Sequence, residues 1–198
     1  MRPSLTRQLK QIDDDIFTVS NIFDGAECLE LVARAESIGF EAASVRTPSG
    51  PKMMTHIRNN DRVVFNDVQL ADEMWKRIRS FLPVLDGQNA CGVDSQLRIY
   101  RYYPGQRFNR HKDGAVSNEL GQTSKLSYLI YLNDDCDGGS TTFCHYCDVS
   151  GTREKIEFIV MPATGTALLF RHERWHEGTP IAAGVKYVLR SDVFYATG

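Results

Sequence analysis

The sequence predicts a mainly β protein with flanking helices (α+β), in which two N-terminal helices precede an antiparallel sandwich or barrel. Two segments in the first half carry apolar residues at helical spacing. The second half consists of short segments rich in β-branched and aromatic residues, separated by Gly, Asn and Asp. A chain of 198 residues, 42% of them hydrophobic, suffices for one core. We therefore expect a single domain over residues 1–198, with helical support and loops in 1–95 and the β core in 96–195.

Composition and charge limit the classes of partner. The formal net charge of −2 gives no basic field that would attract nucleic acid. The five cysteines are scattered and odd in number, which is typical of a reduced chain. No stretch approaches the roughly 20 apolar residues of a membrane span, and the N-terminus has no apolar run of signal-peptide length. We expect a cytoplasmic protein without a nucleic-acid or membrane partner.

The first helix is expected over residues 25–38. Asp24 suits the N-cap, and Glu27 lies at the spacing of a capping box. Gly39 would end the helix in a left-handed conformation. Residues 1–12 resemble a loosely held arm. The apolar face of the helix would comprise Leu29, Val32, Ala33, Ala35 and Ile38.

The second helix is expected over residues 70–82, and Pro83 would end it. Its apolar side would comprise Leu70, Met74, Trp75, Ile78 and Phe81, and its solvated side Lys76, Arg77 and Arg79. The segment 41–62 between the helices is rich in loop residues, and we expect it to form part of the entrance to a site in the β core. It contains Arg46, His56, Arg58, Asn59 and Asn60, of which His56 is expected at the surface.

The strands of the β core are expected at 97–103, 125–132, 141–143, 155–161, 166–171 and 186–195. The segment after the third of these contains Cys144 and Cys147, a C-x-x-C without a second pair to close a zinc site. We interpret this segment as a turn with incidental thiols.

One segment of the core carries a candidate pair of metal ligands. A Pro104-Gly105 turn leads into a short extended stretch with His111 and Asp113. Residues two apart on a strand point the same way, about 6–7 Å apart, so an imidazole and a carboxylate would face one point. A third ligand from a distant strand would complete the facial triad of non-haem Fe(II) sites, which leaves positions open for a co-substrate and oxygen.

His176 is the candidate third ligand. Lys186 follows ten residues later, after a proline and a glycine turn, and opens a strand. On that strand Lys186, Val188 and Arg190 share one face, and charged residues on an otherwise apolar segment need a partner inside the protein. A bound dicarboxylate would be such a partner.

In this ordered set the sequence resembles the 2-oxoglutarate/Fe(II)-dependent dioxygenases, specifically their prolyl 4-hydroxylase-like branch. The similar segments run in order through residues 97–195. They are Tyr102-x-x-Gly105-Gln106-x-Phe108-x-x-His111-x-Asp113, then Tyr131-Leu132-Asn133 and Gly138-Gly139-Ser140-Thr141-Thr142-Phe143, and finally His176 with Lys186. The resemblance implies a double-stranded β-helix (jelly-roll) core with N-terminal helices packed on one side.

The resemblance also implies the cofactors and the residues that bind them. The implied Fe(II) ligands, which are also the catalytic residues, are His111, Asp113 and His176. Lys186 would pair with the distal carboxylate of the co-substrate 2-oxoglutarate, Tyr102 would hydrogen-bond the same carboxylate, and Arg190 is the substitute candidate. O2 would be consumed, 2-oxoglutarate would yield succinate, and ascorbate is a candidate reductant. The substrate would be a peptidyl side chain, first of all proline, or alternatively a free amino acid or another small molecule.

Two places depart from the prolyl hydroxylases of this family. Ser124 and Ser127 stand where those enzymes usually carry Arg and Thr, and Ser140 replaces the acid of their Gly-Gly-Glu-Thr. We expect neither change to touch the metal, and both bear on the choice of substrate.

Other interpretations use some of the same residues. His172-Glu173-Arg174-Trp175-His176 is a literal H-E-x-x-H, the zinc metalloprotease motif. That chemistry needs both histidines on one helical face. Gly178 and Pro180, which disfavour a helix, follow His176 within four residues. A nucleic-acid demethylase of the same superfamily would be expected to interleave basic and aromatic residues. A barrel that binds metal without catalysis would leave Lys186 without a role.

Overall fold

The computed structural model describes residues 6–47, 50–149 and 152–196, and two antiparallel sheets form its core. The order in the larger sheet is β1 (Leu9–Asp13), β2 (Ile16–Val19), β14 (Ala167–Arg171), β10 (Thr123–Tyr131), β17 (Lys186–Ala196), β8 (Gln96–Tyr102), β6 (Asp61–Asn66) and β3 (Glu41–Ala42), with β7 (Asn89–Val93) also paired to β17. The order in the smaller sheet is β13 (Thr152–Val160), β12 (Thr141–Val149), β15 (His176–Gly178) and β9 (Phe108–His111). Two short pairs join β4 (Val45–Thr47) to β5 (Gly50–Lys52) and β11 (Asp137–Gly138) to β16 (Ile181–Ala183).

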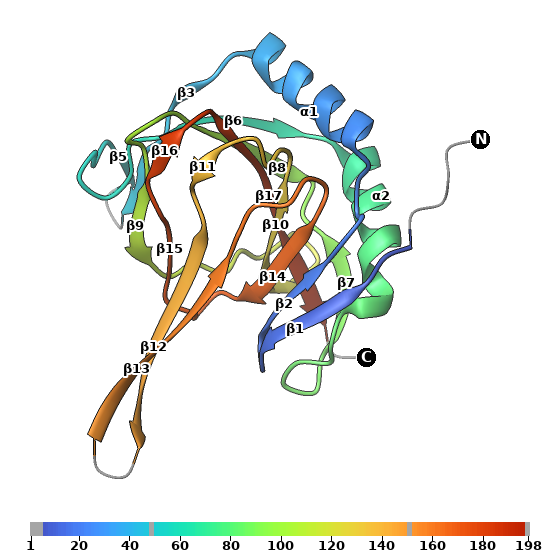
Figure 1. The fold of residues 1–198 in the computed structure, drawn as a ribbon. Helices are drawn as coiled ribbons and strands as arrows, with labels where there is room; N and C mark the ends of the chain where they lie inside the picture. Colours follow the sequence, from blue (N-terminus) through green and yellow to red (C-terminus); the bar gives the residue numbers. More distant parts are fainter. Residues whose placement is uncertain (1–5, 48–49, 150–151, 197–198) are drawn as a thin grey trace.

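The strands wrap around a common interior, and the two helices lie outside it along one side (Figure 1). The strand pairings found within the described ranges are antiparallel. The predicted jelly-roll core with helices on one side is therefore confirmed. The β12–β13 hairpin extends away from the body of the molecule.

The first helix, α1 (Gly25–Ile38), has the predicted bounds and the predicted capping box between Asp24 and Glu27. Its buried side matches the prediction only in part. Ala35 is buried and Val32 packs against the core as predicted, but Cys28 and Leu31 are buried as well, whereas Leu29 is 69% exposed and Ile38 is 48% exposed. The face of the helix that contacts the core is therefore rotated relative to the predicted one. Gly39 has a positive φ of 94°, but its ψ of 140° is not that of a left-handed helix.

The second helix, α2 (Val68–Ile78), continues as a 3-10 turn, η1 (Arg79–Phe81), before Pro83. Met74 and Ile78 are buried as predicted. Arg77, which was expected in solvent, is instead partly buried and makes two hydrogen bonds to Glu27 at 2.7 and 2.9 Å and one to Ile22 O at 2.7 Å. It therefore ties α2 to the start of α1.

The alternating side chains of β17 separate the two hydrophobic clusters of the core. Leu189 and Val193 belong to the main cluster, which unites both helices with the larger sheet. Val188 faces the other way, into a second cluster with members from both sheets. Because strand residues alternate between faces, Lys186 and Arg190 lie on the inner face with Val188. The helices thus support β17 from outside while its charged residues face the interior.

Several segments form strands where the sequence predicted loops. Residues of the expected N-terminal arm form β1, which pairs with β2 at the edge of the larger sheet. Strands β3, β6 and β7 also come from the first 95 residues, so this part contributes to the sheet as well as covering it. Cys144 lies inside the nine-residue strand β12 and not in a turn. The side chain of Cys147 is outside the described part.

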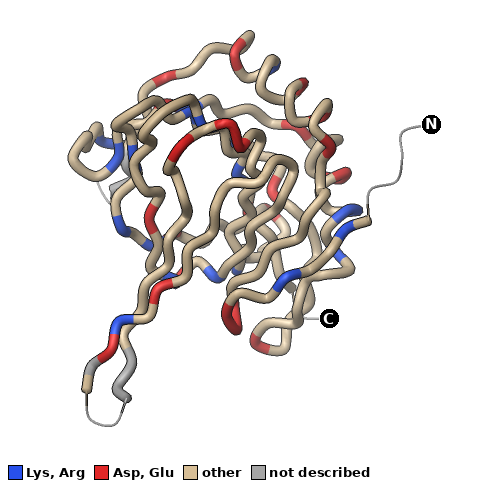
Figure 2. The backbone as a smooth tube through the Cα atoms, in the orientation of Figure 1, with Lys and Arg blue, Asp and Glu red and all other residues tan. Residues whose placement is uncertain are grey.

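Charges are spread over the elements of the fold. Both blue and red segments occur over most of the tube in Figure 2, including on the β12–β13 hairpin. No helix in the described part is long and apolar enough to cross a membrane.

Candidate metal centre

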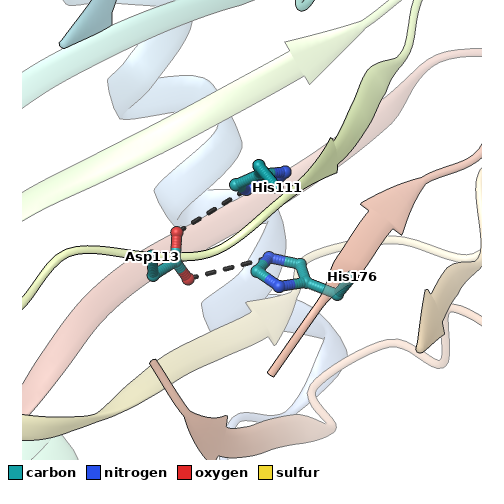
Figure 3. A group of neighbouring side chains, drawn as sticks. All are labelled: His111, Asp113 and His176. Atoms are coloured by element: carbon teal, nitrogen blue, oxygen red, sulfur yellow. Dashed lines mark ion pairs between the residues drawn. The ribbon is translucent and has the colours of Figure 1, made fainter. Parts of the chain in front are cut away.

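The three sequence-predicted ligands come together where β9 and β15 pair. His111 ends β9 and lies opposite His176, which begins β15. Asp113 follows just beyond β9, and its backbone N–H donates to His172 O at 3.0 Å. Figure 3 shows the three side chains converging, with His111 Nε2 3.6 Å from Asp113 Oδ1 and His176 Nε2 3.7 Å from Asp113 Oδ2. One ligand atom from each residue lies within 4.8 Å of the others.

The hydrogen bonds of the two imidazoles fix their tautomers. His111 Nδ1 lies 2.8 Å from Asn109 O, and His176 Nδ1 lies 3.0 Å from Arg174 O. A carbonyl oxygen only accepts, so both Nδ1 atoms carry the proton and both Nε2 lone pairs remain free. Burial lowers the pKa of His176 to about 4, so that this ring is neutral at physiological pH. The Nε2 atoms of both histidines can therefore coordinate a metal cation.

Asp113 supplies the negative charge of the centre. Burial alone would raise the pKa of this carboxyl, but Arg190 and the two imidazoles hold it well below its usual value. Arg190 Nη1 lies 2.8 Å from Oδ1, and Ser127 Oγ donates to Oδ2 at 2.5 Å. The expectation that the Ser127 position leaves the metal site untouched is thus wrong, because its hydroxyl contacts a candidate ligand. Two neutral imidazoles and one ionised carboxylate suit Fe(II).

A chain of hydrogen bonds runs from Asp113 through Ser127 and His172 to Ser124, and the donor of each bond can be assigned. Ser127 gives its proton to Asp113, so its oxygen accepts from His172 Nδ1 at 2.9 Å. His172 Nε2 then accepts from Ser124 Oγ at 2.8 Å, and this oxygen accepts from Val116 N–H at 3.0 Å. Burial lowers the pKa of His172, which agrees with a neutral ring. No sequence motif predicts this chain of hydrogen bonds, since Ser127 and His172 meet only through the pairing of β10 with β14.

The same arrangement excludes the H-E-x-x-H interpretation. Residues 172–175 form a turn and not a helix, and Glu173 is exposed. Both ring nitrogens of His172 are occupied by Ser124 and Ser127, and the cluster that could hold a metal includes His176 but not His172.

A pocket opens from the triad toward β8 and β17. Its lining residues are Tyr100, Tyr102, Phe108, His111, Asp113, Leu129, Thr141, His176, Gly178, Lys186, Val188 and Arg190. Lys186 is 4% exposed, its Nζ donates to Gly139 O, and it lies 5.2 Å from the Tyr131 ring and 5.6 Å from the Tyr102 ring. Burial lowers the pKa of Lys186 to about 8. No carboxylate pairs with this amine among the described residues, so the pocket contains a buried cation that can pair with an anionic ligand.

Comparisons with known proteins agree with the fold. The family model of the 2OG-Fe(II) oxygenase superfamily matches residues 97–191, which include the triad, Tyr102, Lys186 and Arg190. A search of curated proteins finds no match.

Solved structures of prolyl hydroxylases share the fold. The viral collagen prolyl hydroxylase of Paramecium Bursaria Chlorella virus-1, in complex with 2OG, is 19% identical with a TM-score of 0.62, and the match covers 91% of this chain and 96% of that one. The prolyl-4-hydroxylase of Pseudomonas putida is 18% identical with a TM-score of 0.62, covering 91% and 92%. A Trichoplax adhaerens prolyl hydroxylase, in complex with a peptide fragment of hypoxia inducible factor, is 18% identical with a TM-score of 0.65, covering 91% and 84%. Residues 97–191 therefore form a domain of the 2OG-Fe(II) oxygenase superfamily, the fold is that of prolyl hydroxylases, and the protein is a dioxygenase that uses Fe(II), 2-oxoglutarate and O2.

Proposed function

We propose that this dioxygenase hydroxylates a side chain in a peptide or protein, with proline as the first substrate, and that His111, Asp113 and His176 bind its iron. One observation carries the assignment of the site. The three candidate ligand atoms lie within 4.8 Å of one another and open into the same pocket as the buried Lys186, which has no carboxylate partner among the described residues. A metal ion and a dicarboxylate bound at these positions would be adjacent.

The residues around the metal would bind and orient 2-oxoglutarate. Lys186 would pair with its distal carboxylate, and Tyr102, opposite Lys186 in the β8–β17 pairing, would line the same position. Arg190 would hold Asp113 in place and balance its charge. When bound, the iron supplies the oxidation chemistry, in which 2-oxoglutarate and O2 yield succinate and CO2 and one oxygen atom enters a C–H bond of the substrate.

A peptide substrate has support from the structural neighbours and from the pocket. The proteins with the same fold include prolyl hydroxylases, one of them with a bound peptide fragment. The walls of the pocket above the triad are aromatic, from Tyr100, Tyr102 and Phe108, and would pack against the apolar faces of a proline ring. A free amino acid is the alternative substrate of the same chemistry.

The test is 2-oxoglutarate turnover by iron-loaded protein, with ascorbate as reductant. Proline peptides, other peptides, free amino acids and methylated nucleotides are offered separately, and succinate and the mass of each product are measured. We expect succinate release coupled to a gain of one oxygen atom on a proline peptide. Coupled turnover only on another class would reject proline, and retention of turnover by Asp113→Ala would reject the site.

A further inference from the structure

We propose that Arg58 binds a carboxylate of the primary substrate, a role that rests on the proposed function and adds an acidic group to the substrate class. The Arg58 side chain is buried, with 5% exposure. Its Nε donates to Asn60 Oδ1 at 3.1 Å, and its Nη2 is buried without a hydrogen-bond partner. The neighbouring acid Asp61 is already paired with Arg101 at 3.0 Å. Among the described residues, Arg58 forms no ion pair.

Arg58 belongs to a stack that ends at the metal centre. The Phe108 ring lies parallel to the His111 imidazole, with centroids 3.5 Å apart and an interplanar angle of 18°. The guanidinium carbon of Arg58 lies 4.1 Å from the Phe108 centroid and 4.8 Å from the Tyr100 centroid. One face of Phe108 is covered by His111, so Arg58 covers the other. Both rings that hold Arg58 line the pocket.

The unsatisfied charge indicates an anionic ligand. Burial of a cation without an anion is unfavourable, and two aromatic faces offset only part of this cost. The two rings contact the guanidinium, and its Nη2 has no hydrogen-bond partner. Guanidinium N–H groups match the two oxygens of a carboxylate, so a carboxylate would satisfy this nitrogen.

Two carboxylates could approach Arg58 from the side of the pocket that Tyr100 and Phe108 line, one from 2-oxoglutarate and one from the primary substrate. Lys186, between the Tyr102 and Tyr131 rings, already offers a charge to the co-substrate. Arg58 is held instead by Phe108 of β9, with which its backbone forms a bridge, on the side of the entrance segment. Arg58 and His111 both stack on Phe108, at 4.1 Å and 3.5 Å from its centroid. A chain spans about 3.3–3.6 Å per residue, so an acid that reaches Arg58 would lie one or two residues from the oxidised position.

The experiment compares acidic and neutral substrates on matched variants. Proline peptides with Asp at each position within two residues of the proline are paired with their Asn counterparts, and proline-ended peptides with a free C-terminus are paired with their amides. Arg58→Gln is compared with wild type and with Arg107→Gln. Arg107 is a suitable control because its Nε also donates to an asparagine two residues on, Asn109, but the side chain is exposed.

We expect wild type to have a KM at least about 10-fold lower for one acidic peptide than for its neutral partner, the effect of a hydrogen bond to a charged group. Arg58→Gln should abolish this preference and leave the KM for 2-oxoglutarate unchanged, and Arg107→Gln should keep the preference. Absence of any preference in wild type, or its survival in Arg58→Gln, would overturn the proposal. A rise in the KM for 2-oxoglutarate alone would assign Arg58 to the co-substrate and overturn it as well.

A second measurement separates this proposal from the proposed function. If no proline peptide is turned over, proline is rejected, and the acid and amide comparison moves to free amino acids and their amides. Thermal unfolding of Arg58→Met needs no turnover at all. A binding residue predicts an unfolding midpoint equal to or above that of wild type, because an unpaired buried charge is removed. A fall of more than about 5 °C would show that Arg58 supports the fold, and would overturn the binding role.

Discussion

At the scale of single residues, the site is an alternating row of charges. Arg190 lies between Asp113, at 2.8 Å, and Asp192, at 3.5 Å, and Arg98 lies 3.3 Å from Asp192. The two acids balance the two arginines, so a divalent cation at the triad leaves an excess of positive charge to which Lys186 adds. A dianion such as 2-oxoglutarate would offset two of these three positive charges. The residues around the proposed metal site would thus favour binding of the co-substrate as well as of the ion.

Lys186 should control the affinity for 2-oxoglutarate and not that for iron. In Lys186→Ala we expect the KM for 2-oxoglutarate to rise about 30-fold or more, the loss of a buried charge pair, with iron affinity retained. Lys125→Ala, which removes a lysine paired with the exposed Asp86, should leave the KM unchanged. An unchanged KM in Lys186→Ala would reject this role for Lys186 and make Arg190 the candidate partner of the 2-oxoglutarate carboxylate.

The pH dependence of 2-oxoglutarate use should follow the same amine. Below its pKa of about 8, Lys186 is charged and can pair with the carboxylate, and above it the neutral amine cannot. We expect kcat/KM for 2-oxoglutarate to fall above pH 8, and the profile of Lys186→Arg to stay flat there. The free energy of unfolding should change in the opposite sense and rise with pH above 8. In the folded protein the pKa lies below the ordinary lysine value of 10.5, so the cost of burying the charge is relieved as pH rises from 8 toward 10.5. A parallel fall of kcat/KM in Lys186→Arg would contradict the assignment.

The two histidines of the H-E-x-x-H segment should respond differently to removal. His176→Ala deletes a ligand atom and should abolish iron binding. His172→Ala deletes the donor to Ser127 and should weaken iron about 10-fold to 100-fold, as is usual for residues that orient a ligand. Iron content and dissociation constants check this, and His172→Gln should restore part of the affinity. Equal loss in both alanine variants would show that His172 does more than position Asp113.

At the scale of elements, Arg77 joins the two helices that support the larger sheet. We expect Arg77→Ala to lower the free energy of unfolding by about 2 kcal/mol, since hydrogen bonds to charged groups contribute about 1.5–3 kcal/mol each and this pair is partly exposed. Chemical denaturation measures the loss. The control, Lys76→Ala, changes an exposed side chain on the same turn and should stay within about 0.5 kcal/mol of wild type. An equal loss in both would attribute the effect to helix propensity.

The elements also show what a sequence can and cannot predict. Local signals sufficed to predict the bounds and the capping box of α1, whose Asp24 and Glu27 are three residues apart. They also sufficed to predict that Lys186, Val188 and Arg190, at every second position of β17, share its inner face. The same local logic failed for Arg77, whose partner Glu27 is 50 residues away, and for Ser127, which meets Asp113 and His172 only after β10 and β14 pair. Contacts of this kind depend on sheet register, which periodicity does not encode.

At the scale of the whole molecule, the metal centre connects parts of the chain that are far apart. His111 and Asp113 come from the start of the β core and His176 from near its end, and β17 supplies Arg190. A cation that binds all three ligands therefore bridges β9 and β15 directly and engages the larger sheet through Asp113 and Arg190. Such a cation binds the folded state alone, so its binding free energy adds to the stability of the entire fold.

Metal loading should accordingly raise the thermal stability of the protein. With Mn(II), which avoids oxidation in air, at 100 times its dissociation constant, the gain is about 2.7 kcal/mol, or roughly 5–10 °C in Tm for a chain of this size. Asp113→Asn should lose this gain, and its metal-free Tm should already be lower, because Arg190 would lose the nearer of its two charge partners. Glu157→Gln, which changes an acid of the β12–β13 hairpin that is paired with Lys155, should keep the full gain. A metal-induced shift of equal size in Asp113→Asn would place the bound ion elsewhere in the molecule.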